Sequence, residues 1–172
     1  MKTHEFTIIA SGLDHNAENF ENRLFEAGCS DATIAFVKGA LRLDFEREAT
    51  TFAKALLTAI RDVKRAGAKV ERIEPDYLVS TSDIAKRSGL SRAAVSLFTS
   101  GQRAKEKEFP KPVARVTTDS PLWDWFYVAR WMYHRHQLDL DAVVQAKLLR
   151  EANRAIAAED FEHTSFVRRA VG

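Results

Sequence analysis

The chain has 172 residues, enough for one large domain or two small ones. Its 45% hydrophobic and 29% charged residues are typical of a globular protein and exclude a disordered chain. No apolar run approaches the ~20 residues of a membrane span, and the first ten residues lack the layout of a signal peptide. The single cysteine, Cys29, excludes an internal disulfide and a cysteine metal site, and it fits a cytoplasmic protein.

The net charge of +2 is unevenly distributed along the sequence. Residues 1–76 hold 11 Lys and Arg against 13 Asp and Glu, and residues 137–172 hold 5 against 6. Residues 77–136, in contrast, hold 10 Lys and Arg against 5 Asp and Glu. Such a basic excess suits a phosphate backbone, although small domains often carry a few surplus positive charges without binding nucleic acid.

The first 76 residues predict an α/β domain. Alternating and helical apolar patterns indicate a strand at 4–11, a helix at 17–27, strands at 32–37 and 40–47, a helix that begins after Thr50 or Thr51, and a strand at 69–74. Lys38-Gly39 favours a hairpin between the second and third strands. This βαββαβ order is that of a ferredoxin-like domain, with both helices on one face of an antiparallel sheet.

A ferredoxin-like fold by itself indicates little about function. Acylphosphatases share it but carry a catalytic arginine in the loop after the first strand, and residues 12–16 of this sequence contain none. We therefore expect this domain to serve as a scaffold for dimerisation, or to bind a partner protein or a small effector.

The stretch from Ser80 to Arg103 predicts two short helices joined by a tight turn. Ser82 is expected to cap the first helix, Gly89 to end it, and Ser91 to cap a second helix that runs to about Thr99. The run I-A-x-x-x-G-L-S-x-x-x-V over residues 84–95 resembles the helix-turn-helix of many bacterial DNA-binding regulators.

A wing is expected to follow this helix pair. Residues 113–117 read as a strand, 118–121 as a turn and 122–123 as a return strand, after which Asp124 caps an aromatic helix. The segment resembles winged helix-turn-helix proteins of the MerR and AlpA/excisionase kind in these residues: Phe109, Pro110, Pro112, Val113, Trp123, Trp125, Val128 and Trp131. The spacing of the three tryptophans favours core packing over a stacking platform for single strands.

The resemblance implies that the second helix enters the major groove. Arg92 is then expected to read a guanine, and the wing to bind phosphates. The predicted DNA-contacting residues are Thr81, Ser82, Lys86, Ser91, Arg92, Ala93, Ser96, Thr99, Arg103, Lys111 and Arg115.

The last segment, residues 137–172, predicts a helix that Asp139 or Asp141 caps and that ends near residue 158, followed by a charged tail. We expect a homodimer because regulators that read palindromes need a two-fold partner. The sequence favours no dimerising element over the others.

The sequence indicates no enzyme, cofactor or metal. It lacks a P-loop, a G-x-G-x-x-G, an H-E-x-x-H and a nucleophile elbow, and His134 and His136 diverge on a helix. The expected function is a cytoplasmic, sequence-specific transcriptional regulator of bacterial or phage type that binds double-stranded DNA without membrane attachment. Two alternatives stay open: an antitoxin that also binds a partner protein, and an excisionase-like architectural DNA binder of a phage or mobile element.

Overall fold

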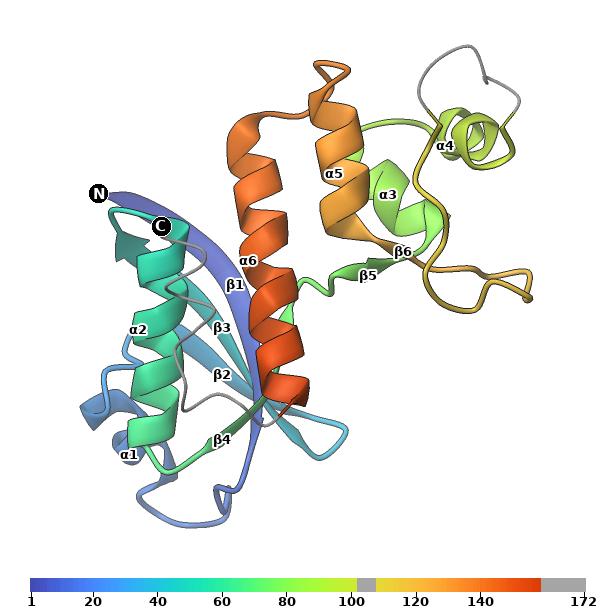
Figure 1. Ribbon diagram of the computed structural model, residues 1–172. Helices are drawn as coiled ribbons and strands as arrows, with labels where there is room; N and C mark the ends of the chain where they lie inside the picture. Colours follow the sequence, from blue (N-terminus) through green and yellow to red (C-terminus); the bar gives the residue numbers. More distant parts are fainter. Residues whose placement is uncertain (102–107, 159–172) are drawn as a thin grey trace. The chain divides into compact units, whose positions relative to one another are not determined.

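The computed structural model describes residues 1–101 and 108–158 of an α+β protein (Figure 1). The chain divides into two compact units. The N-terminal unit comprises Met1–Pro75 together with residues 151–158, and the central unit comprises Asp76–Arg150. The predicted arginine contact at Arg103 and the charged tail after residue 158 lie outside the described residues.

The N-terminal unit is a four-stranded antiparallel sheet with two helices, as the sequence predicts. Its elements are β1 (Lys2–Ser11), α1 (Phe20–Glu26), β2 (Ala32–Val37), β3 (Ala40–Ala49), α2 (Phe52–Arg65) and β4 (Lys69–Glu74). The strands lie in the order β2-β3-β1-β4, and every neighbouring pair is antiparallel.

Both helices pack on the same face of this sheet. Phe20 of α1 lies 5.4 Å from the ring of Phe36 in β2, and Phe52 of α2 lies 5.8 Å from Phe6 in β1. Phe36 and Phe6 pair with Leu41 and Phe45 of β3, which share one face because side chains alternate along a strand. The core of this unit therefore lies between that face and the two helices.

Several boundaries differ from the sequence prediction, and the first strand already begins at Lys2 rather than at residue 4. The first helix begins at Phe20 rather than at residue 17, because the preceding residues form turns in which Ala17 N donates to Asp14 O and Phe20 N to Ala17 O. The third strand extends to Ala49, which pairs with Lys2 at the start of β1. Thr51 caps α2, as expected for one of the two threonines.

A buried ionic cluster joins the sheet to both helix ends. Arg47 of β3 is 7% exposed and donates to both carboxylate oxygens of Asp31 (2.7 and 2.8 Å), to Asp62 (2.7 Å) and to Gly28 O (2.7 Å). Burial lowers the pKa of Arg47, but the hydrogen bonds with Asp31 and then Asp62 outweigh it and raise the pKa overall. Cys29 lies buried beside them, and burial, followed by the charge of Asp62, raises its pKa to about 11.

The central unit consists of helices, a short sheet and a small hairpin. Its elements are β5 (Leu78–Val79), α3 (Thr81–Ser88), α4 (Arg92–Thr99), β6 (Trp123–Asp124), α5 (Trp125–Tyr133) and α6 (Leu140–Ala157), the last of which continues into the N-terminal unit. Strands β5 and β6 are antiparallel, with Val79 opposite Trp123. None of the helices among the described residues is long and apolar enough to cross a membrane.

The hairpin is shorter than the predicted wing. Instead of a strand over residues 113–117, a single bridge joins Ala114 to Leu122. The reason is the left-handed backbone of Arg115 (φ 52°), which turns the chain so that Thr118 N donates to Arg115 O (3.1 Å). Of the predicted return strand, Leu122 pairs with Ala114, whereas Trp123 pairs with Val79 of β5, a strand that the sequence prediction did not include.

Asp139 is the residue that caps α6, because its carboxylate accepts from Ala142 N (2.8 Å). The apolar side of α6 is buried at Val143, Ala146, Leu148, Leu149 and Ala152. Val143 and Ala146 pack with α3, α4 and α5 in the core of the central unit.

Candidate nucleic-acid interface

The first helix of the candidate interface, α3, begins with a capping box. Ser80 Oγ accepts from Asp83 N (3.2 Å), and the Asp83 carboxylate accepts from Ser80 N (2.9 Å). The prediction that Ser82 caps this helix is wrong, because only Ser80 has an acidic residue three positions later. The Ser80 hydroxyl also donates to Asp83, and this bond holds the pKa of the Asp83 carboxyl below its ordinary value.

The turn between α3 and α4 has the geometry that the sequence predicts. Gly89 ends α3 in the left-handed region (φ 70°), where a side chain would be strained. Ser91 then caps α4 by accepting from Ala94 N (3.1 Å). Leu90 packs, half-buried, against the core of the central unit.

Helix α4 has one buried and one exposed face. Val95 is fully buried and Phe98 is 7% exposed, and both face inward. Arg92, Ala93 and Ser96 are exposed on the other face. The inward contacts hold α4 firmly while this exposed face remains accessible to a ligand.

The other predicted contact residues vary in accessibility. Exposed positions are Ser91, Lys86, Lys111 and Arg115, and half-buried ones are Thr81, Ser82 and Thr99. The Thr99 hydroxyl donates to Ser96 O (3.1 Å), which leaves it less available for a base.

An aromatic cluster fixes the chain that follows α4. Trp131 makes edge-on contacts with Phe98 and Phe109, each at 5.1 Å between ring centroids, and Trp123 Nε1 donates to Pro110 O (3.0 Å). Trp123 and Trp125 are buried, as predicted, whereas Trp131 is half-buried. The Phe109-Pro110 step is therefore attached to both α4 and α5.

The central unit contains two interactions of charged side chains that the sequence did not predict. Asp124 caps α5 as expected, but its buried carboxylate also accepts from Arg150 Nε (2.6 Å), 26 residues away. Arg87 of α3 lies 5.4 Å from the ring of Trp125, and burial lowers its pKa. Neither relationship has a local sequence signal, because each partner comes from a distant element.

The charged groups of this unit suit an anion better than a cation. Within residues 1–101 and 108–158, no group of three or more His, Cys, Asp or Glu is placed to hold a metal. The exposed basic side chains Lys86, Arg92, Lys111 and Arg115 all belong to the central unit.

No protein-family model, curated protein or solved structure matches the chain. Any assignment of function therefore depends on the residues and geometry described above.

Proposed function

We propose that the central unit is a winged helix-turn-helix and that the protein is a cytoplasmic regulator of transcription that binds specific double-stranded DNA sequences. The observation that carries this proposal is the exposed face of α4. Arg92, Ala93 and Ser96 project from a short helix whose opposite face is anchored by Val95 and Phe98. A rigid helix with a small, polar outer face is suited to the major groove.

The side chains of this face have the chemistry for base reading. Arg92 is exposed and pairs with no carboxylate among the described residues, so its guanidinium is available for O6 and N7 of a guanine. Ala93 and Ser96 are small enough for close approach. Lys86, Lys111 and Arg115 would neutralise phosphates and fix the register of the protein on DNA.

We also propose that the N-terminal unit is ferredoxin-like and contributes to a homodimer. The βαββαβ element order and the strand order β2-β3-β1-β4 support the fold. A two-fold dimer would present two α4 helices to a palindromic site.

The test is selection of bound duplexes from a random pool by the full chain at two salt concentrations. We expect a defined site, for which Arg92→Ala costs about 1–3 kcal/mol and relaxes the preference at one position. The matched control is Arg154→Ala, an exposed arginine in the part of α6 that belongs to the N-terminal unit.

The basic residues of the hairpin segment should behave differently. Lys111→Ala or Arg115→Ala should weaken binding to all sequences alike and reduce the salt slope by about one. Binding with no sequence preference, unaffected by Arg92→Ala, would contradict the proposal. Bending of DNA without an effect on transcription would favour the excisionase-like architectural alternative. A small protein that co-purifies with the chain would favour the antitoxin alternative.

A further inference from the structure

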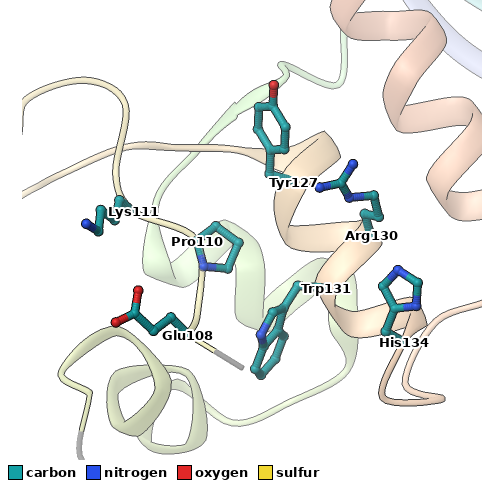
Figure 2. A pocket seen from close by; sticks show the side chains of 7 residues that line it. All are labelled: Glu108, Pro110, Lys111, Tyr127, Arg130, Trp131 and His134. Atoms are coloured by element: carbon teal, nitrogen blue, oxygen red, sulfur yellow. The ribbon is translucent and has the colours of Figure 1, made fainter. Parts of the chain in front are cut away.

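The central unit contains a pocket that the proposed DNA contacts do not explain. It has a volume of about 530 Å³ and lies between the extended segment at Glu108, Pro110 and Lys111 and one side of α5 (Figure 2). The wall on this side consists of Tyr127, Arg130 and Trp131 of α5 and of His134, the residue that follows the helix. These four positions recur at the three- and four-residue spacing of one helix face, and the volume suits a small organic ligand.

Two cations line this pocket, Lys111 and Arg130, and the guanidinium of Arg130 lies over the rings of Phe126 (5.8 Å) and Tyr127 (5.7 Å). Lys111 and Arg130 are both exposed, and neither pairs with a carboxylate among the described residues. Glu108 supplies the only acidic group of the lining that the structure describes, so positive charge predominates. These cations favour an anionic ligand.

A second, smaller pocket in the N-terminal unit provides a contrast. It has a volume of about 270 Å³ and is lined by Arg23 and Arg65. There Arg23 donates to Ala66 O (2.9 Å), and Arg65 Nη2 lies 3.2 Å from Asp62 Oδ1. Because those guanidinium groups already donate to oxygen atoms, this pocket is a weaker candidate for an anion.

Two aromatic side chains of the larger pocket, Trp131 and Tyr127, are held in place by contacts outside it. Trp131 is fixed by its edge-on contacts with Phe98 and Phe109. The Tyr127 hydroxyl lies 3.4 Å from Arg150 Nη2, whose guanidinium is in turn bound to Asp124. Aromatic walls that are already positioned reduce the entropy cost of binding a flat ring.

We propose that this pocket binds a small planar aromatic anion. The ring would contact the aromatic side chains of the lining, and a carboxylate or phosphate group would bind Lys111 and Arg130. We further propose that occupancy alters DNA binding through the contact between Trp131 and Phe98 of α4, a part that rests on the proposed function.

The first test is calorimetric titration of the full chain with benzoate and phenyl phosphate, and with benzamide and inorganic phosphate as the neutral and non-aromatic controls. We expect at least one aromatic anion to bind, about tenfold or more tighter than either control. Arg130→Gln should weaken this binding about tenfold or more, whereas Arg92→Gln, an exposed arginine of the same unit, should leave it unchanged.

Three results would contradict the proposed binding site. They are absence of binding by both aromatic anions at about 10 mM, equal binding by Arg130→Gln, and equal affinity for benzamide or inorganic phosphate. Circular dichroism of Arg130→Gln should give the wild-type melting curve, since the side chain is exposed.

The second test measures affinity for the selected duplex with and without the aromatic anion. We expect the anion to change the affinity of the wild type but not that of Arg130→Gln. If Arg130→Gln instead lowers DNA affinity and the salt slope without affecting the anion response, the pocket cations serve the DNA backbone and the proposal is wrong. If the wild type binds no DNA, the proposed function fails while the calorimetric result stands.

Discussion

The side-chain amide of Asn153 forms two hydrogen bonds with the backbone of Ile73: Ile73 N donates to Oδ1 (2.9 Å), and Nδ2 donates to Ile73 O (2.8 Å). Ile73 lies in β4, an edge strand of the sheet. By donating and accepting together, the amide replaces the neighbouring strand that this edge lacks. Because Asn153 comes 80 residues later, on α6, this pair attaches the end of that helix to the N-terminal unit.

Replacing Asn153 by leucine should destabilise the N-terminal unit by about 2–4 kcal/mol, because the buried N–H and C=O of Ile73 then lack partners. Urea unfolding followed by circular dichroism measures this loss. The exposed neighbour Arg154, changed to alanine, is the control and should cost no more than about 0.5 kcal/mol. Equal midpoints for the two variants would contradict the structural role of the amide.

Arg47→Met should be among the most destabilising changes in the chain, at about 3–5 kcal/mol, because it leaves the carboxylates of Asp31 and Asp62 without their shared cation. The comparison is Arg42→Met, which removes a solvent-exposed pair with Asp44 and should cost about 1 kcal/mol or less. Chemical denaturation of both variants checks the difference, and similar losses would show that the buried cluster contributes little.

Cys29 should make the protein less stable at high pH. Its folded-state pKa of about 11 exceeds the ordinary value of 9.0, so the folded chain holds the thiol proton more tightly than the unfolded chain. The contribution of this thiol to the free energy of unfolding is therefore fully present below pH 9. It falls by about 2–3 kcal/mol as the pH rises to 11. Unfolding curves at several pH values should show a smaller decline for Cys29→Ala, and identical slopes would contradict the prediction.

Protonation of Asp83 at low pH should lower the stability of the central unit. The Ser80 hydroxyl, followed by the Ser80 backbone N–H, lowers the folded-state pKa of Asp83. Its contribution is therefore present above the unfolded-state pKa and is lost as the pH falls through the folded value. Denaturation between pH 6 and about pH 2 should show a smaller acid-induced decline for Asp83→Asn than for the wild type. Equal declines would mean that the capping box does not titrate as described.

Local patterns were sufficient where one element contains the whole signal. The alternation of Leu41, Leu43 and Phe45 predicted β3, and the two threonines before Phe52 predicted the start of α2, which Thr51 caps. Gly89 and Ser91 predicted the turn into α4, because a left-handed glycine and a serine cap act within a few residues.

Local patterns failed where the structure depends on contacts between segments that are distant in the sequence. The predicted wing strand after Val113 is interrupted at Arg115, and Trp123 of its return strand pairs with Val79 rather than with the wing. The pocket is another example: Lys111 and Arg130 are 19 positions apart in the sequence, and only the packing of the extended segment near α5 places both in one lining.

By itself, the sequence determined the order of the elements in the N-terminal unit, the helix pair around Gly89 and the outward face of α4, because these depend on periodicity, capping and turn residues. The tertiary structure decided the partners of the isolated polar groups. The Arg47 cluster, the Asp124–Arg150 pair and the bonds from Asn153 to Ile73 all join residues that are far apart along the chain. A buried polar group without a partner costs free energy. Its partner is therefore set by which distant residues the folded unit brings next to it, and not by the local sequence.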